Sequence, residues 1–133
     1  MKALDTNVLV RFLVKDDDKQ ARKVYRKFKR CEADKEVLFV PAVVVLETIW
    51  VLESVYDVTR RDILDAIDQL LLMPILAFEG PAAIRRFVLS ARGNGCELSD
   101  LLIAHTARAA GCECVITFDK RASKCDLFEL LQS

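Results

Sequence analysis

The sequence lacks the features that mark several classes of protein. Its 20 basic and 20 acidic residues leave no net charge, so it is not expected to coat nucleic acid by bulk attraction, and any such binding must use a local patch. The most apolar late stretch, Leu70–Phe78, is far too short to span a bilayer. Asp5 and Arg11 interrupt the apolar N-terminal segment, which argues against a signal peptide. We therefore expect no membrane partner.

Glycine, proline and histidine are also scarce. The four glycines and three prolines form no linker, and no repeat is present, so residues 1–133 are expected to fold as one domain. The single histidine, His105, and five cysteines that contain no Cys-X-X-Cys pair do not match the pattern of a zinc site. An odd number of cysteines predicts reduced, mostly buried thiols, as in a cytoplasmic protein.

What the chain does contain is an alternation of short apolar runs and longer amphipathic ones. Strands are predicted over 1–4, 36–40, 75–78, 114–117 and 127–131, and helices over 8–14, 16–31, 42–56, 60–73, 81–92 and 100–110. Thr59 and Ser99 are predicted to cap the helices that follow them. This order predicts an α/β fold, a three-layer sandwich with a central, mainly parallel sheet flanked by helices.

Four acids fall where such a fold places its ligands, outside the carboxyl ends of the strands. Asp5 and Asp119 directly follow predicted strands, and Glu47 and Asp100 lie near the starts of predicted helices. Because a carboxylate at the end of a buried strand needs a cation, we expect these acids to share a metal. Oxygen ligands of this kind suit Mg²⁺ or Mn²⁺, which can activate water and neutralise charge on a phosphodiester. Hydroxyl and amide neighbours could orient the acids: Thr6, Asn7 and Thr117.

Each acid also has an ordinary structural explanation. Asp5 could cap a helix, Glu47 could face solvent, Asp100 could serve a helix dipole and Asp119 could be a turn residue. Because the neighbours of Glu47 are apolar, we expect this acid to have a specific role. Trp50 is expected in the core or in a subunit interface.

Basic residues offer a further alternative. Lys19–Arg30 is either a solvated helix face or a track for a phosphate backbone. Lys120 and Arg121 adjoin Asp119 and are candidate RNA contacts.

The chain contains four motifs in this order: LDTNVLV at 4–10, VPAVVVLETIWVL at 40–52, SDLLIAHTARAAGCECVITFDK at 99–120 and SKCDLFELL at 123–131. Together they resemble the PIN-domain family, and within it the VapC-type toxin ribonucleases. The resemblance implies that Asp5 and Asp100 are the principal Mg²⁺ ligands and that Glu47 and Asp119 complete the pocket. It also implies a metal-dependent endoribonuclease that cleaves RNA, acts as the toxin of a toxin–antitoxin pair, forms a homodimer and binds a cognate antitoxin.

Two other functions fit parts of the pattern. A non-catalytic PIN-like module that binds RNA or protein would usually have lost one of the four acids, and all four are present. A phosphoacceptor receiver domain also clusters acids at strand ends, but it predicts paired acids after the first strand, where Thr6 and Asn7 follow Asp5.

Overall fold

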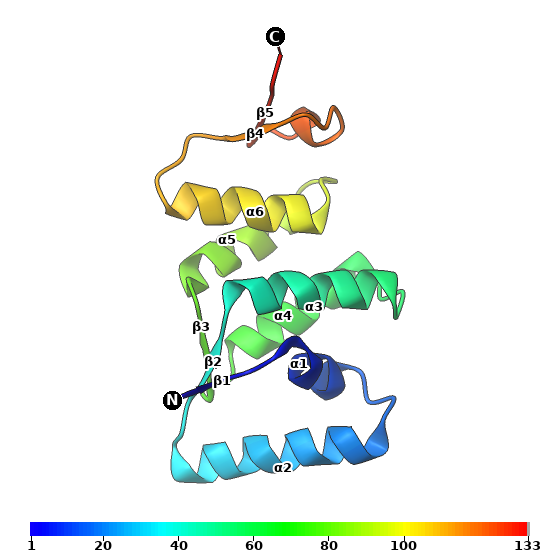
Figure 1. Cartoon of the computed structure of the whole chain (residues 1–133), viewed down its shortest axis with the longest axis vertical. Coiled ribbons are helices and arrows are strands. Elements are labelled where there is room, and N and C mark those ends of the chain that lie inside the picture. The colour runs from blue at the N-terminus through cyan, green and yellow to red at the C-terminus, as the bar shows by residue number, and fades with distance from the viewer. Residues whose placement is uncertain (133) are drawn as a thin grey trace. The chain divides into compact units, whose positions relative to one another are not determined.

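The computed structural model describes residues 1–132 and shows a chain that divides into two compact units, Met1–Glu79 and Gly80–Ser133. Helices and strands alternate along the chain, and every strand pair is parallel (Figure 1). The predicted α/β class is confirmed. Its strands pair as a three-stranded sheet in the first unit and a two-stranded sheet in the second.

The first unit is a parallel sheet in the order β1-β2-β3 with four helices. The strands are β1 (Lys2–Ala3), β2 (Leu38–Val40) and β3 (Leu76–Phe78), and the helices are α1 (Thr6–Leu13), α2 (Asp18–Asp34), α3 (Ala42–Ser54) and α4 (Arg60–Leu71). Helix α1 packs against both α2 and α3 and lies between them in Figure 1. The core includes the fully buried side chains of Leu9, Val40, Ile49 and Ile63.

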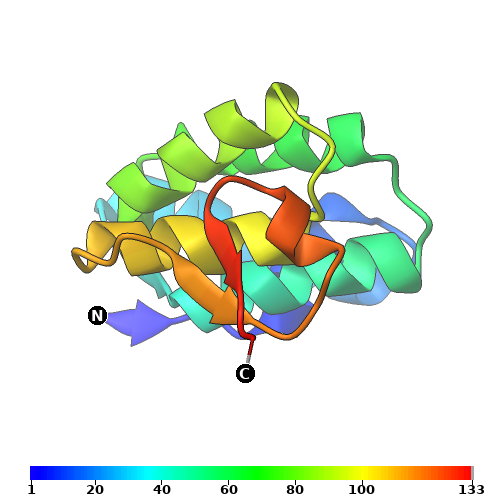
Figure 2. The ribbon, with the colours of Figure 1, turned by 90° about the horizontal axis from the view of Figure 1, so that it is seen from above.

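The second unit pairs two helices and a small parallel sheet. Its elements are α5 (Pro81–Arg92), α6 (Leu98–Ala109), β4 (Val115–Thr117), a 3-10 helix η1 (Ala122–Lys124) and β5 (Phe128–Leu130). Helices α5 and α6 pack together, and β4 and β5 lie side by side (Figure 2). Ala104 of α6, Ala122 and Phe128 form a buried cluster, so the sheet packs on α6.

Capping side chains explain where several helices begin. Helix α1 starts at Thr6, two residues before the predicted start, because Asp5 Oδ1 accepts a hydrogen bond from the Thr6 N–H at 2.8 Å. The prediction that Thr59 caps α4 is confirmed, since its side chain accepts from the Asp62 N–H at 3.2 Å. The prediction for Ser99 is wrong: α6 begins at Leu98, and Ser99 lies inside its first turn.

The prediction of reduced, mostly buried cysteines is also wrong. Cys96 and Cys125 form a disulfide, and of the three free thiols only Cys31 is buried, while Cys112 is exposed. The two bonded cysteines are 29 residues apart and meet only because the start of α6 lies beside the end of η1.

The fold contains no obvious membrane segment among residues 1–132. None of the helices described there combines the length and apolar composition that a bilayer crossing requires.

Candidate active site

In the first unit, folding joins Asp5, Thr6 and Glu47. Thr6 is buried at the start of α1, and its hydroxyl donates a hydrogen bond to Glu47 Oε1 of α3 at 2.8 Å. Asp5 holds the same turn of α1 through its bond to the Thr6 N–H. The segment after β1 is thereby linked to an acid 41 residues further along the chain. Asn7, the second residue of α1, is exposed.

The expectation that Asp5 ends a buried strand is wrong. Both residues of β1 are exposed, as is Asp5 itself, although its two neighbours in the chain, Leu4 and Thr6, are buried. Because water reaches the carboxylate, burial alone does not require a cation there. The case for a metal at Asp5 therefore depends on its neighbours.

Helix α3 presents Glu47 on its exposed face. The backbone N–H of Ala42, at the helix start, donates to Glu79 Oε1 at 2.8 Å, so an acid that follows β3 caps α3. On the same face, Val43 and Trp50 are 61% and 60% exposed. The expectation that Trp50 packs in the core of the chain is wrong.

In the second unit, Asp119 follows β4 and organises the turn into η1. Its N–H donates to Thr117 Oγ1 at 3.0 Å, and its Oδ1 accepts from the N–H of Arg121 at 2.8 Å and of Ala122 at 3.4 Å. Asp119 therefore serves as the turn residue that its position suggested, and Thr117 orients it. Lys120 and Arg121 are exposed beside it.

Asp100 lies in the first turn of α6 in an acidic environment. Burial raises the pKa of Asp100, and the negative charges of Glu97 and Asp119 raise it further. Asp100, Glu97 and Arg121 also line a hollow of about 460 Å³. The unit therefore brings Asp100 and Asp119 close enough for their charges to interact.

Glu97 is a residue that the sequence patterns did not single out. It stands one helical turn before Asp100, and this spacing places two acids on the same face of a helix, which is the signal that could have identified it. Its carboxylate lies 3.7 Å from the Arg121 guanidinium, but both side chains are exposed, so the pair adds little stability.

The four predicted acids thus form two pairs, with Asp5 and Glu47 in the first unit and Asp100 and Asp119 in the second. Among residues 1–132, no three Asp, Glu, His or Cys side chains converge closely enough to hold a metal ion on their own. The pairs nonetheless have the donor chemistry of a magnesium site, because their ligands are oxygens.

Three of the acids also carry the outer hydrogen bonds that orient metal ligands. One oxygen each of Asp5, Glu47 and Asp119 accepts a bond from an N–H or a hydroxyl. Within the described part of the chain, the second oxygen of each has no hydrogen-bond donor. A carboxylate held by one oxygen and open at the other suits a ligand to Mg²⁺.

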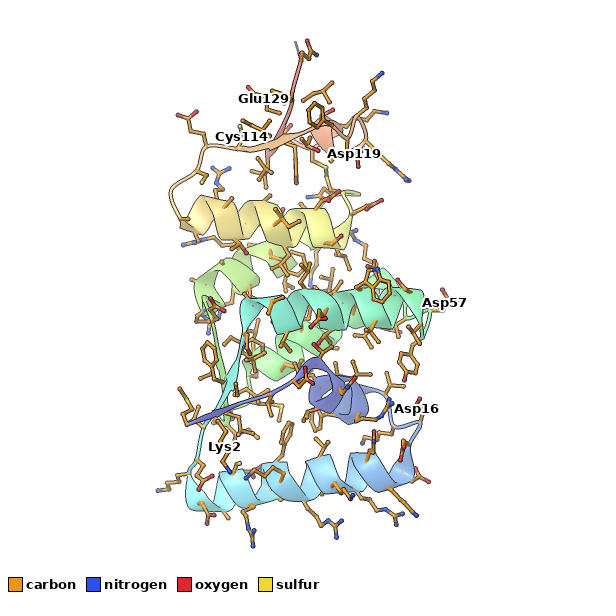
Figure 3. The ribbon with its side chains drawn as sticks, in the orientation of Figure 1. Lys2, Asp16, Asp57, Cys114, Asp119 and Glu129 are labelled. Carbon is orange, nitrogen blue, oxygen red and sulfur yellow. A yellow bond between two sulfur atoms is a disulfide. The ribbon has the colours of Figure 1, made fainter. Side chains whose placement is uncertain are left out.

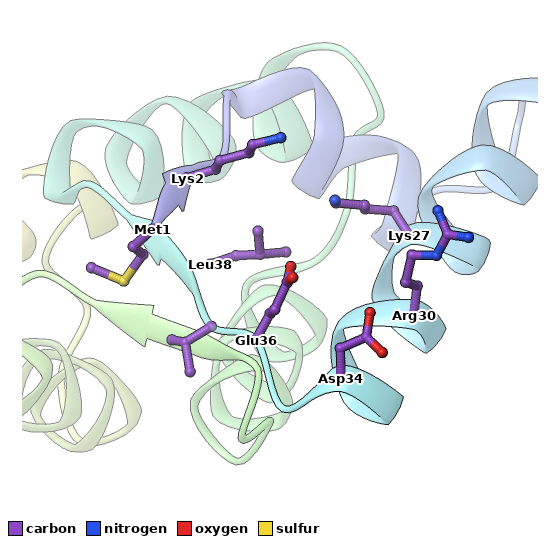
Figure 4. Close-up of a pocket in the computed structure, with 8 residues that line it drawn as sticks. Met1, Lys2, Lys27, Arg30, Asp34, Glu36 and Leu38 are labelled. Carbon is purple, nitrogen blue, oxygen red and sulfur yellow. The ribbon is translucent and has the colours of Figure 1, made fainter.

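A larger hollow of the first unit lies elsewhere. It measures about 900 Å³ and is lined by both charges, among them Lys2, Arg30, Asp34 and Glu36 (Figure 4). Met1 precedes β1, Lys2 begins it, and Glu36 precedes β2, so this hollow is at the amino ends of the strands. Ligands of parallel sheets gather at the carboxyl ends, which is where the first acidic pair lies.

Comparison with known proteins identifies the family of the chain. The model of the PIN domain family matches residues 2–126, and the chain belongs to this family. It is also similar to a VapC ribonuclease from Aquifex aeolicus (strain VF5), with 31% identity over 125 residues that make up 93% of this chain and 91% of that protein. The resemblance carried by the four sequence motifs is confirmed.

Proposed function

We propose that this chain is a Mg²⁺-dependent endoribonuclease that hydrolyses RNA phosphodiester bonds and acts as the toxin of a type II toxin–antitoxin pair. The proposal is carried by the similarity to a VapC ribonuclease along nearly the whole chain. The hydrogen-bonded Asp5–Thr6–Glu47 arrangement and the Asp100–Asp119 pair support it. Asp5, Glu47, Asp100 and Asp119 then hold the metal, and Mn²⁺ could replace Mg²⁺.

In this proposal the four acids are the metal ligands, and neighbouring groups hold those acids in place. The metal and a water would then carry out the hydrolysis. Bound Mg²⁺ neutralises charge on the phosphodiester and lowers the pKa of water. Thr6 keeps Glu47 oriented because its hydroxyl donates a hydrogen bond to Oε1, and this leaves Oε2 available. The N–H groups of Arg121 and Ala122 hold Asp119 Oδ1 in a similar way, and Thr117 Oγ1 fixes the backbone of Asp119 by accepting from its N–H.

RNA cleavage with matched acid variants tests the enzyme. Wild-type protein is given a panel of folded and single-stranded RNAs with Mg²⁺ or with EDTA, alongside Asp5→Asn and Asp100→Asn. We expect EDTA and either substitution to lower cleavage by about 100-fold or more, the range seen when one charge-stabilising group is removed. Glu32→Gln and Glu113→Gln, which change exposed acids elsewhere, should cleave normally.

Two outcomes would contradict the mechanism. Cleavage that persists in EDTA and in both Asp variants would show that the acids and metal are not required. Metal binding without cleavage of any RNA would instead favour a PIN-like binding module.

The toxin role and its partners need separate tests. By family resemblance, the chain acts in the cytoplasm, forms a homodimer and is inhibited by a cognate antitoxin. The exposed Val43 and Trp50 on α3 support a protein partner at this helix, because large exposed apolar side chains are typical of interfaces. Expression should arrest growth, and Asp100→Asn should relieve the arrest. Growth that continues with active wild-type enzyme present would contradict the toxin role.

A further inference from the structure

Helix α2 carries the densest charge in a chain whose net charge is zero. Between positions 19 and 30 no acid occurs, and seven of the residues are basic: Lys19, Arg22, Lys23, Arg26, Lys27, Lys29 and Arg30. A net charge of zero cannot attract a polyanion, so a local concentration of this kind is the only way for the chain to do so by charge.

Helical geometry gathers most of these cations into one stripe. At about 100° per residue, the helix places four of them within about 40° of their mean direction: Lys19, Lys23, Arg26 and Arg30. Arg22 lies at the edge of this group. The buried residues Val24, Phe28 and Cys31 lie on the opposite side. The basic stripe, as we call Lys19, Arg22, Lys23, Arg26 and Arg30, is exposed along its whole length. Figure 3 shows side chains that end in nitrogen projecting from α2 on the side away from α1.

The stripe is free to bind an external anion. Within residues 1–132, none of Lys19, Lys23 and Arg26 forms an ion pair with a carboxylate, and Arg22 donates only to the backbone carbonyl of Asp18. Together with Arg22, these side chains line a shallow groove of about 210 Å³. A basic face that only contacts solvent would not require acids to be absent from positions 19–30.

The helix that carries the stripe is firmly anchored. Phe28 packs on Phe12 of α1 with the ring centres 4.9 Å apart, and Arg11 donates to Gln20 Oε1 at 2.6 Å. Arg11 also bonds Tyr56 and Asp16, which fixes the start of α2 to the end of α1 and the chain after α3. An anchored helix loses little backbone entropy when its cations bind a regular array of phosphates.

An exposed aromatic side chain lies on α2 outside the stripe, on the flank of the helix that also carries Lys29. Tyr25 is 54% exposed, and the Lys29 ammonium lies 5.5 Å from its ring centre. An exposed aromatic ring beside cations is a combination that nucleic-acid surfaces use, because bases stack on the ring while cations contact the backbone.

We propose that the basic stripe of α2 binds the phosphate backbone of the RNA substrate away from the bond that is cut. This inference rests on the proposed ribonuclease function. The stripe faces away from α1, and α1 separates α2 from α3, which carries Glu47 (Figure 1). An RNA that reaches both the stripe and the Asp5–Glu47 pair must therefore extend well beyond the cleaved segment.

The test compares charge-matched variants on long and short RNA. The stripe variant combines Lys19→Gln, Lys23→Gln and Arg26→Gln, and the control combines Lys2→Gln, Arg61→Gln and Arg108→Gln, which removes the same charge at other exposed positions. Glutamine has nearly the helix propensity of the residues it replaces. Binding of a folded RNA transcript is measured by fluorescence anisotropy in EDTA over a range of salt.

We expect the stripe variant to bind the transcript about tenfold or more weakly at low salt. The slope of log affinity against log salt should fall by about 2–3, as for three lost phosphate contacts. With Mg²⁺, its kcat/KM should fall for the transcript but not for a short oligoribonucleotide that contains only the cleaved segment. The control should match the wild type in all these measurements.

Several results would overturn the inference: equal loss in stripe and control variants, an unchanged salt slope, or equal loss on the short oligonucleotide. Loss of binding to anionic vesicles, with RNA binding intact, would assign the stripe to a membrane surface instead. If the wild type cleaves no RNA but the stripe variant still loses RNA binding, the proposed enzyme fails while the stripe's role stands. If the wild type cleaves RNA and the stripe variant binds and cleaves it equally well, the proposed enzyme stands and the inference about the stripe fails.

Discussion

Among single residues, Asp100 shows how a binding site lowers the stability of the free protein. Burial raises the pKa of Asp100, and Glu97 and Asp119 raise it further, so the folded chain holds this proton more tightly than the unfolded chain does. Stability contributed by the protonated form is therefore lost as the pH rises from 3.8 through the raised pKa. Asp100→Asn should raise the Tm of the metal-free protein by about 1–3 °C at neutral pH.

Thermal unfolding in EDTA measures this effect. The gain should vanish below pH 3.8, where Asp100 is protonated in both states. Glu113→Gln, a change at an exposed acid of the same unit, should leave the Tm unchanged. A lower Tm for Asp100→Asn at neutral pH would show that Asp100 stabilises the fold instead of serving a ligand.

His105 is the second residue with an unfavourable environment. Within residues 1–132, neither of its buried ring nitrogens has a hydrogen-bond partner. Burial lowers the pKa of His105, and Arg108 and Arg86 lower it further. Because the unfolded chain takes up this proton first, stability should fall as the pH drops from 6.5 through the lowered pKa.

Replacement of His105 by leucine tests both features. His105→Leu should stabilise the chain by about 1 kcal/mol above pH 6.5, since two unpaired buried nitrogens are removed. It should also reduce the loss of stability below that pH. Urea unfolding above and below pH 6.5 gives the free energy of unfolding under both conditions. If the pH dependence of this free energy is the same in the variant as in the wild type, His105 is not the titrating group.

At the scale of elements, the Cys96–Cys125 disulfide secures the part of the second unit that carries its acids. It joins Cys96, two residues before α6, to Cys125, which follows η1, and Asp100, Thr117 and Asp119 lie in the loop that it closes. A cross-link over 29 residues stabilises a chain by about 3–4 kcal/mol. Cys125→Ser, or reduction of the wild type, should therefore lower the Tm by about 10 °C.

Calorimetry with and without a reductant checks this expectation. Cys112→Ser is the matched control, because Cys112 is an exposed free thiol of the same unit and its loss should change nothing. If the reductant lowers the Tm of Cys125→Ser as much as that of the wild type, a group other than this disulfide is responsible.

The elements also show what could be predicted from the sequence and what could not. Apolar spacing was sufficient to predict the alternating helices and strands, since it reflects which face each element buries. The start of α1 at Thr6 depends on the Asp5 cap, which spacing does not reveal, and α6 begins at Leu98 without a side-chain cap from Glu97. Exposure of Asp5 and the Cys96–Cys125 bond depend on segments distant in sequence. For the acids, spacing indicated strand and helix ends, but the Thr6–Glu47 bond was visible only after folding.

For the whole molecule, the central question is whether the two acidic pairs act on one metal centre. Asp5 and Glu47 belong to the first unit, and Asp100 and Asp119 belong to the second. If both pairs bind the same ion, loss of either pair removes most of the affinity for that ion. Loss of the other pair as well then lowers the affinity only a little further. Two independent sites would instead each survive a substitution in the other unit.

A double-mutant cycle on Mn²⁺ binding separates these cases. We expect Asp5→Asn and Asp100→Asn each to weaken binding by about tenfold or more, and the double variant to weaken it by less than the product of the two. Calorimetric titration gives both the affinity and the number of ions bound, with Glu32→Gln and Glu113→Gln as controls. Strictly multiplicative losses, or an ion retained by each single variant at full affinity, would contradict a shared centre. Because Asp5 is exposed and Asp100 is partly buried, only such coupling, and not the burial of either acid, can establish that the quartet functions as a unit.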